Sequence, residues 1–440
     1  MPVSPARLAA FNILLRVERE SAYADELLHS SMLAELSPLD RNLATEIVMG
    51  VLRWRSVLDE TIARFSFTPF RKLDVEVLTA LRIGIYQKQF LSKIPAHASV
   101  NETVELVKQA KKTSAAGLVN AVMRKVKSEQ YDLHASKLTG EAYLSSALAH
   151  PKWLVERWAK NFGAEHAQLI CEYDQRIPHT TVRLNSAEDE AALTTHNIQL
   201  APGALMKNAR IVISGDLTPE LLQSRNIAIQ DEGSQLIAAL VGEGQRILDC
   251  CAAPGSKTAA IAARHRTAEI IAAERHPHRA SLLRRLVPQS NVQVVTADAI
   301  NLPYTAEFDC ILADVPCSGT GTLAHNPEIK WKLKAEDLTD LQSRQIAILK
   351  AAMNYLRPRG KLLYSTCSLE PEENEQVITA CLQGNKDFQI VPIKEELIRL
   401  QQAGDLVWED IDKLVSGNFL RTIPGVHPCD GFFAVVLKKN

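Results

Sequence analysis

Hydrophobic residues recur every three or four positions through the first third of the chain. The spacing is clear in residues 8–15 and again in residues 47–52, where apolar positions fall on one side of a helix. Ser37-Pro38 has the serine and proline that commonly open a helix, and another helix is expected to begin at Ser99. We therefore expect residues 1–140 to form an all-α domain.

The middle of the chain changes its pattern. An amphipathic helix is expected to start at Pro151 and to run to about Tyr173. Residues 181–185 and 211–213 then alternate apolar and polar side chains, as half-buried strands do. These elements predict a small α+β module over residues 141–230.

From residue 231 onward, short apolar runs alternate with helical stretches. The expected strands are residues 246–250, 269–273, 292–296, 308–313, 361–365 and 432–437. Strands separated by helices are typical of a doubly wound α/β sheet whose strands are mostly parallel. Residues 231–440 are therefore expected to form a Rossmann-like domain.

The composition is that of a soluble globular protein. With 440 residues, of which 46% are hydrophobic and 23% charged, the chain is expected to fold as two or three domains. No apolar run approaches the roughly 18 residues that span a bilayer, and the stretch from Met1 to Arg7 lacks the layout of a signal peptide. We expect a cytoplasmic monomer with no membrane attachment.

The eight cysteines predict reduced thiols. None of them is spaced as Cys-x-x-Cys, and cysteine and histidine do not cluster with the spacing of a zinc site. Cys250 and Cys251 are adjacent, and neighbours in sequence rarely form a disulfide. We therefore expect no metal, mostly inert core cysteines and at most two that are chemically active.

Charge is distributed unevenly along the chain. The net charge is −1, which argues against a chain that binds polyanions along its whole length. Residues 1–140 nevertheless carry 19 basic and 15 acidic residues. This bias suits an amino-terminal domain that contacts nucleic acid through one face.

The stretch from Phe308 to Gly321 contains the first candidate for chemistry. An apolar strand ends there in Asp314, followed by Cys317 and two glycines. Ligands bind at the carboxyl ends of parallel strands, so an acid and a thiol at this edge indicate a reaction centre. A strand followed by a glycine-rich turn with a passively buried cysteine is the alternative.

A second strand also ends in a cysteine. Cys367 follows the apolar run of residues 361–365, and Pro371 is expected to mark the start of a helix. A helix amino terminus lowers the pKa of a thiol, whereas the nearby Glu370, Glu372 and Glu373 would raise it. Two strand ends that each bear a cysteine favour a shared site.

Residues 247–258 end the first strand of this domain in a loop of small residues. A phosphate-binding loop is excluded, because Ser256 separates Gly255 from Lys257 and the upstream glycine is missing. A dinucleotide fingerprint is also absent. The loop therefore lets a ligand approach the backbone closely without the features that hold phosphates.

Acidic residues stand at three strand ends. Glu274 follows the second strand at the position where Rossmann-like proteins bind a ribose, Asp298 follows the third and Asp314 the fourth. Each acid could instead cap a helix. Together, and without a phosphate loop, they favour a nucleoside-bearing cofactor that has no phosphates, and S-adenosylmethionine fits that description.

Paired thiols also fit methyl transfer to a pyrimidine. Carbon 5 of the ring is a poor nucleophile until a thiolate adds to carbon 6, and loss of the carbon-5 proton later releases the enzyme. The base must be unstacked before the thiol can reach it.

The amino-terminal sequence resembles the RNA-binding helical domain of the antitermination factor NusB. The similarity lies in short motifs within residues 5–127. These are residues 40–41, 51–53, 100–102 and 118–125. The resemblance implies an all-α, NusB-like domain that contacts RNA.

The carboxy-terminal half closely resembles the RNA 5-methylcytosine methyltransferase family. Three hallmarks occur in order: Ala-Ala-Pro-Gly-x-Lys-Thr at residues 252–258, Asp-x-Pro-Cys-Ser-Gly at 314–319 and Ser-Thr-Cys-Ser at 365–368. Residues 326–331 and 430–433 support the match. The fold implied is the Rossmann-like class I S-adenosylmethionine-dependent methyltransferase domain. With the NusB-like front, the whole chain is similar to bacterial enzymes that methylate cytosine in 16S ribosomal RNA.

The resemblance also implies roles for individual residues. Cys367 is the expected nucleophile, Cys317 assists release, and Asp314 lies near the methyl donor and the cytosine. Glu274 would bind the ribose hydroxyls and Asp298 would lie beside the adenine. The loop that would wrap the methionine and ribose end of the cofactor consists of Cys251, Ala252, Ala253, Pro254, Gly255, Ser256 and Lys257.

Three departures from the family pattern carry expectations. Ser256 replaces a usual glycine, which is tolerable if its backbone angle is ordinary. Ala324-His325 stands where basic residues are common, so an RNA contact there is expected to be weaker. Residues 358–360 lack the usual double glycine and are expected to lie in a turn.

Two alternative functions stay open at this point. A methyltransferase that acts on transfer RNA would carry the same motifs, and only the NusB-like domain argues against it. An RNA-binding assembly or antitermination factor with an inactive catalytic half is the other alternative. The two intact thiols and three intact acids argue against that possibility.

Overall fold

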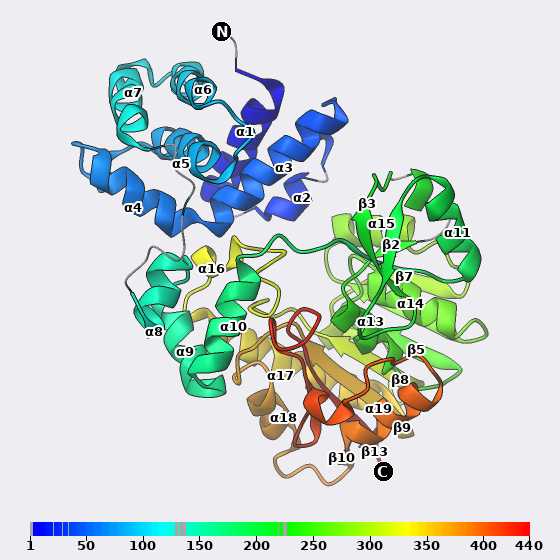
Figure 1. The fold of residues 1–440 in the computed structure, drawn as a ribbon. Helices are drawn as coiled ribbons and strands as arrows, with labels where there is room; N and C mark the ends of the chain where they lie inside the picture. Colours follow the sequence, from blue (N-terminus) through cyan, green and yellow to red (C-terminus); the bar gives the residue numbers. More distant parts are fainter. Residues whose placement is uncertain are drawn as a thin grey trace. The chain divides into compact units, whose positions relative to one another are not determined.

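The computed structural model describes residues 3–20, 22–28, 30–33, 35–127, 131, 138–218, 220–222 and 227–440. The chain forms two units: Met1–Arg176 together with Leu323–Leu333, and Ile177–Thr322 together with Lys334–Asn440 (Figure 1). The domain boundaries expected near residues 140 and 230 stay predictions, and Asn226 lies outside the described residues. Within the described residues, no helix is long and apolar enough to cross a bilayer.

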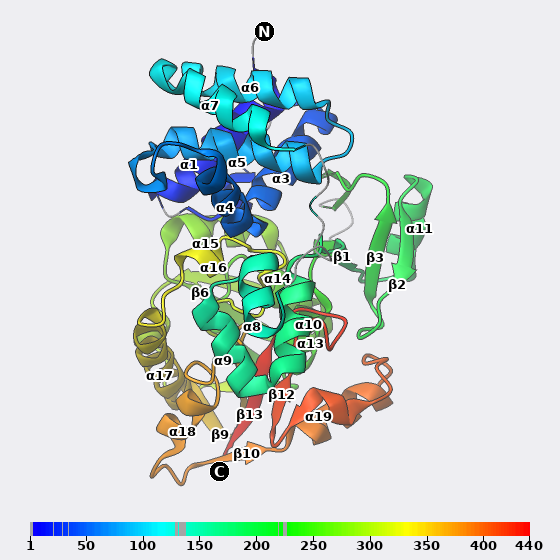
Figure 2. The same cartoon turned by 60° about the vertical axis from the view of Figure 1, so that its left-hand side comes forward.

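The first unit is a bundle of helices built around α5. Its helices before residue 130 are α1 (Pro5–Glu20), α2 (Ala24–Leu28), α3 (Pro38–Arg53), α4 (Arg55–Phe65), α5 (Val75–Phe90), α6 (Ala96–Gln109) and α7 (Ala116–Lys125). Helix α5 contacts α1, α3, α4, α6 and α7 (Figure 2). Every residue from Thr79 to Gln87 is therefore buried, including the polar Arg82. The Arg82 guanidinium is neutralised by Asp59 at 2.6 Å and Glu18 at 3.1 Å.

The helix start expected at Ser37-Pro38 is confirmed, the one expected at Ser99 lies three residues earlier, at Ala96, and one expected helix is broken. Ser37 caps α3 by accepting a hydrogen bond from the Asp40 amide, with Pro38 in the first turn. The single helix expected from Pro151 to Tyr173 is wrong: α9 (Lys152–Phe162) and α10 (Ala164–Asp174) are separate. Gly163 divides them because its φ of 87° ends one helix in the left-handed region.

Residues Leu323–Leu333 lie far along the chain but belong to the helical unit. Hydrogen bonds to α3 and to the start of α2 hold this segment, which includes α16 (Ile329–Lys332). Trp331 Nε1 donates to the Leu52 carbonyl, Arg53 donates to the Ala324 carbonyl and Glu328 accepts from the Ala24 amide. The chain therefore leaves the second unit after Thr322 and returns to it at Lys334.

Lys330 in this segment is a buried amine. Its side chain is 1% exposed, and its Nζ has no hydrogen-bond partner among the described residues. Burial lowers the pKa of Lys330 to about 7, although attraction to Asp174 opposes the shift. Nearby, His150 lies 3.2 Å from Asp174, and burial holds the pKa of His150 well below its usual range.

The second unit opens with a small antiparallel sheet. Its strand order is β2-β3-β1-β4, formed by β1 (Thr181–Arg183), β2 (Gln199–Pro202), β3 (Ala209–Ser214) and β4 (Ala228–Ile229). Helix α11 (Ala187–Thr195) connects the first two strands and begins with a capping box between Ser186 and Asp189. This confirms the α+β character expected of the middle region.

The large sheet of this unit has nine strands, of which β9-β8-β5-β6-β7 are parallel neighbours. These are β5 (Arg246–Asp249), β6 (Glu269–Glu274), β7 (Val292–Thr296), β8 (Phe308–Asp314) and β9 (Leu356–Thr366). Strand β13 (Phe433–Lys439) adds to β9 in the antiparallel direction, and β10 (Phe388–Val391), β12 (Phe419–Arg421) and β11 (Val415–Ser416) complete the sheet. The doubly wound, mostly parallel fold is confirmed (Figure 1).

Helices cover both faces of this sheet because its strands alternate their side chains. Ile247 of β5 packs with α13 (Glu232–Ala239), α14 (Ser256–Arg264) and α19 (Ile393–Gln402), whereas the adjacent Leu248 packs with α17 (Asp337–Tyr355) and α18 (Glu375–Leu382). Helix α15 (Pro277–Leu286) lies on the α14 side, where Leu283 and Val287 pack with Ala259 and Ala272.

Two local expectations in this unit need correction. Residues 358–360 lie inside β9 rather than in a turn between elements, but they loop out of the ladder, because Leu356 pairs with Phe308 and Lys361 with Cys310. Pro371 does not start a helix: residues 371–374 form a turn, and α18 begins at Glu375.

The buried amine makes a prediction about stability and pH. Unfolded Lys330 would bind a proton below its ordinary pKa of 10.5, whereas the folded protein binds it only below about 7. The unfolded state therefore binds more protons between these values, and Lys330 makes stability rise with pH by at most about 1.4 kcal/mol per unit. The gain in the free energy of unfolding of Lys330→Met over the wild type should therefore be larger at pH 7 than at pH 9. Thermal unfolding at both values measures this. Lys334→Met, at an exposed lysine just outside the segment, is the control. A difference that does not change with pH would contradict the prediction.

Candidate functional site

The two predicted thiols meet at the carboxyl edge of the parallel strands. Strands β8 and β9 pair in parallel with Asp314 opposite Ser365. The two segments that follow these strands therefore leave the sheet at the same level. Cys317 Sγ and Cys367 Sγ consequently lie 3.2 Å apart. Neither cysteine is a fully buried core residue, since both side chains are partly exposed. The structure thus brings together the two cysteines that the sequence placed 50 residues apart.

Glu373 holds the two thiol-bearing turns together. Its carboxylate accepts hydrogen bonds from the Ser318 amide at 2.8 Å, from the hydroxyls of Ser318 and Ser368, and from Gln345 Nε2 at 2.9 Å. Glu373 is completely buried, so these donors replace water around its charge. Sequence reasoning considered Glu373 only for its effect on a thiol pKa and missed this structural role. Its position directly after the second thiol turn is the only sequence signal.

Backbone contacts fix the same two turns. The Gly321 amide donates to the Cys367 carbonyl at 2.9 Å, and the Gly431 amide donates to the Gly321 carbonyl at 2.8 Å. A Cβ at Gly321 would lie 2.3 Å from the Gly431 carbonyl oxygen. Only glycine allows this approach. Residues 430–433, which supported the family resemblance in the sequence, therefore help to fix the turns that carry the two thiols.

The surroundings of Cys317 keep it protonated. Its hydrogen bond to Cys367, then burial, then the negative charges of Cys367 and Glu373 raise the pKa of Cys317 well above its usual range. A thiol that keeps its proton is suited to donate a hydrogen bond to a neighbouring thiolate. The structure therefore favours Cys317 as the thiol that keeps its proton.

Lys257 and Asp314 form an ion pair beside the thiols. Lys257 Nζ lies 2.8 Å from Asp314 Oδ2, and Ser365 donates to Asp314 Oδ1 at 2.7 Å. Burial alone would lower the pKa of Lys257, but the charge and hydrogen bond of Asp314, with attraction to Cys367, raise it. Lys257 therefore places a positive charge at the reaction centre. The sequence motif predicted only that Lys257 lies in the loop expected to bind the cofactor.

The loop from Cys251 to Lys257 leads from β5 into α14. Gly255 has a φ of 122°, and a Cβ there would lie 2.5 Å from Val287 of the segment after α15. Ser256 begins α14 with no positive φ, so the loss of the family glycine is tolerated as expected. The Ala252 amide donates to the Ala273 carbonyl, and Arg279 donates to the Ala253 carbonyl. The loop is thus tied to β6 and α15.

Two of the three acids also stabilise their own turns. Glu274, at the end of β6, is 6% exposed and accepts from the His276 amide at 2.7 Å. Asp298, after β7, accepts from the Ile300 amide and lies 3.4 Å from Arg275. The capping role considered for such acids is therefore present in Asp298, whereas the N-cap of α15 is His276 and not Glu274. Both acids lie at the same sheet edge as Asp314. Asp249, at the end of β5, was missed: burial raises its pKa to about 6, and Thr258 donates to it.

This edge suits a nucleoside without phosphates. Carboxylates stand at the ends of neighbouring strands, where they can accept hydrogen bonds from hydroxyl and amino groups. Lys257, the cation within the loop, is committed to Asp314. Small residues let a ligand approach the backbone. The carboxylates and the loop of small residues therefore fit S-adenosylmethionine.

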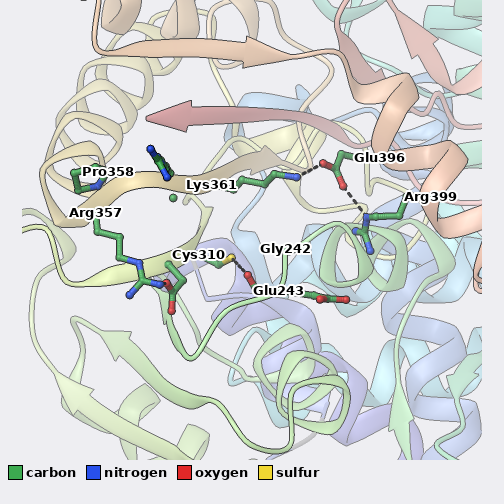
Figure 3. Close-up of a pocket in the computed structure, with 11 residues that line it drawn as sticks. Gly242, Glu243, Cys310, Arg357, Pro358, Lys361, Glu396 and Arg399 are labelled. Atoms are coloured by element: carbon green, nitrogen blue, oxygen red, sulfur yellow. Dashed lines mark hydrogen bonds and ion pairs between the residues drawn. The ribbon is translucent and has the colours of Figure 1, made fainter. Parts of the chain in front are cut away.

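A separate pocket of about 540 Å³ lies at the opposite, amino-terminal edge of the strands (Figure 3). Three of its four cations have partners in the wall: Glu396 accepts from Lys361 at 2.5 Å and from Arg399 at 2.9 Å, and Asp309 pairs with Arg357. None of the predicted site residues lines it. We interpret the lining of this pocket as a network of ion pairs at the amino-terminal edge of the sheet.

Comparisons with known proteins identify the same parts. Residues 237–438 match the family model "16S rRNA methyltransferase RsmB/F", residues 4–128 the NusB family, and residues 150–209 a ferredoxin-like domain of RsmF/B-like methyltransferases. These matches confirm the NusB-like front and the methyltransferase domain expected from the sequence.

Relatives cover the whole chain. A probable ribosomal RNA small subunit methyltransferase B of Bacillus subtilis is 30% identical over 100% of both chains. A ribosomal RNA small subunit methyltransferase B of Pseudomonas putida is 33% identical over 86% of this chain and 88% of the relative. Among solved structures, a methyltransferase homologue from Pyrococcus horikoshii is 28% identical, with a TM-score of 0.54 over 68% of this chain and 99% of that one. The chain therefore belongs to the 16S rRNA methyltransferase RsmB/F family and is an RNA methyltransferase with the S-adenosylmethionine-dependent fold.

Proposed function

We propose that this enzyme methylates carbon 5 of a specific cytosine in 16S ribosomal RNA, with S-adenosylmethionine as donor. The observation that carries the proposal is the pair of thiols 3.2 Å apart at the edge of the sheet. Methylation of an amino or hydroxyl group needs no thiol, whereas carbon 5 of a pyrimidine requires covalent activation. The names of the relatives supply the class of RNA.

Cys367 is the proposed nucleophile. Its thiolate adds to carbon 6 of the flipped-out cytosine, which makes carbon 5 nucleophilic. S-adenosylmethionine, when bound, supplies an electrophilic methyl group. The loop from Cys251 to Lys257 and the acids Glu274 and Asp298 would hold it. Asp314 would orient donor and base, with one oxygen fixed by Lys257 and the other by Ser365.

Cys317 would assist release. Loss of the carbon-5 proton to a base allows the bond between carbon 6 and Cys367 sulfur to break, which returns a thiolate to Cys367. The Cys317 thiol, kept protonated by its surroundings, lies close enough to donate a hydrogen bond to that leaving thiolate. A hydrogen bond to a charged group is worth about 1.5–3 kcal/mol. Its loss should slow release by about tenfold or more.

Bisulfite sequencing tests the product. Ribosomal RNA from a deletion strain should lose one 5-methylcytosine in 16S RNA, because no covalent catalyst remains for that base. Complementation with the wild-type chain should restore it. An unchanged 16S map, or a loss confined to transfer RNA, would overturn the proposed substrate.

Substitution of each thiol tests the roles. Cys367→Ser should abolish turnover and give no covalent RNA adduct, because serine is not ionised at neutral pH. Cys317→Ala removes the thiol hydrogen-bond donor and should accumulate an adduct that survives denaturing electrophoresis, because release is slowed. Cys381→Ser, at a buried cysteine packed against α17, is the control and should leave both readouts unchanged. An adduct in Cys367→Ser would reverse the assignment.

Removal of the buried cation should slow catalysis. Lys257 Nζ lies 2.8 Å from Asp314, so Lys257→Met leaves that carboxylate without its cation and should lower the single-turnover rate across its pH profile by about tenfold or more, because a charge-assisted hydrogen bond is worth about 1.5–3 kcal/mol. Lys257→Arg keeps the charge and should stay nearer the wild-type profile. If both variants lost activity equally at every pH, Lys257 would act through shape and not through charge.

A further inference from the structure

Helix α15 of the methyltransferase unit carries basic residues and no acid. Its sequence from Pro277 to Leu286 contains Arg279, Arg284 and Arg285 and lacks aspartate and glutamate. The helix is directly preceded by Arg275 and His276. Helices α17 and α19 of this unit mix the two signs, as α19 does with Glu395, Glu396 and Arg399. Helix α14 also has basic residues and no acid, but its Lys257 and Arg264 are paired with Asp314 and Asp405.

The basic side chains of α15 divide into those that bond to neighbouring elements and those that face outward. Arg284 donates to the Val294 carbonyl and to Thr296 of β7, and Arg279 donates to the Ala253 carbonyl of the cofactor loop. These two side chains attach the helix to its neighbours. His278 and Arg285, seven residues apart, share one face of the helix, Arg275 lies just before its start, and all three are exposed.

The outward side chains, which we call the α15 basic stripe (Arg275, His278 and Arg285), are weakly neutralised. Arg275 is 61% exposed and lies 3.4 Å from Asp298. His278 and Arg285 face solvent, and helix α15 offers them no carboxylate one turn away. This differs from the pocket at the opposite sheet edge, where carboxylates in the wall accept from three of the four cations.

The stripe starts at the edge that holds the reaction centre. Helix α15 begins three residues after Glu274, the end of β6, and β6 is separated from β9 by β5 and β8. Three strand spacings amount to about 14 Å. The stripe then runs along a helix of about 15 Å. A nucleic-acid strand whose target base lies at Cys367 could therefore pass over it within a few nucleotides.

We propose that the α15 basic stripe binds backbone phosphates of the RNA substrate next to the flipped-out cytosine. This rests on the proposed function for the identity of the partner as RNA. Guanidinium groups suit phosphate oxygens because they donate two parallel hydrogen bonds. Such contacts position the strand without reading its sequence. Because α15 also holds the cofactor loop through Arg279, the same helix would support both donor and acceptor.

Salt dependence of binding tests the stripe without turnover. Affinity of the full-length protein for a single-stranded RNA oligonucleotide, measured at several salt concentrations without cofactor, gives the number of phosphates contacted. Arg285→Gln should weaken binding and reduce the slope of log affinity against log salt by about 0.7. Arg285→Lys should retain most of the slope.

Lys350→Gln is the matched control. Lys350 is an exposed cation on α17, which covers the other face of the sheet, and its substitution changes net charge equally. An unchanged slope in Arg285→Gln, or an equal reduction in Lys350→Gln, would overturn the proposal. A stripe-dependent slope in a protein that leaves 16S cytosines unmethylated would support the stripe while the proposed function fails.

Methylation kinetics provide a second, independent readout. Because Arg285 lies away from the thiols, Arg285→Gln should raise the KM for RNA and leave kcat at saturating RNA unchanged. A fall in kcat with unchanged KM would show that the substitution acts on the catalytic residues and would overturn a binding role.

Discussion

The parallel pairing of β8 with β9 is the constraint on which the reaction centre depends. Because Asp314 stands opposite Ser365, the chain leaves both strands at one level, and the cysteines that follow come within 3.2 Å. The buried carboxylate of Glu373 then joins the two turns through hydroxyl and amide donors. A buried carboxylate is stable only when its oxygens accept hydrogen bonds, so the turns and the acid stabilise one another.

This pairing also sets the electrostatics around the thiols. The hydrogen bond to Cys367 and burial raise the pKa of Cys317 and keep it protonated, and Lys257 brings a positive charge to the same site through its ion pair with Asp314. Asp314 holds Lys257 in place and is itself held by Ser365. The charge at the centre is thus set by residues from the ends of β8 and β9 and from the loop after β5.

The two edges of the large sheet have opposite electrostatic character. At the amino-terminal edge, cations and carboxylates face one another and close a pocket. Helix α15, which has no acid, starts at the carboxyl edge, and its outward cations run from there along the helix. A basic surface that starts about 14 Å from the thiols is consistent with a polyanionic substrate. The family assignment and the local charge distribution therefore point to the same partner.

The sequence by itself determined the helical first third, the positions of the parallel strands along the chain and both cysteines at strand ends, because these follow from hydrophobic period and chain order. Tertiary structure decided that β8 lies beside β9, that Glu373 bridges two turns and that Lys257 pairs with Asp314. It also placed Leu323–Leu333 among the helices and divided α9 from α10 at Gly163. The pairings and the placement of that segment depend on contacts between distant residues, whose free energy no local pattern records. The break at Gly163 depends on a backbone angle that the packing of two helices selects.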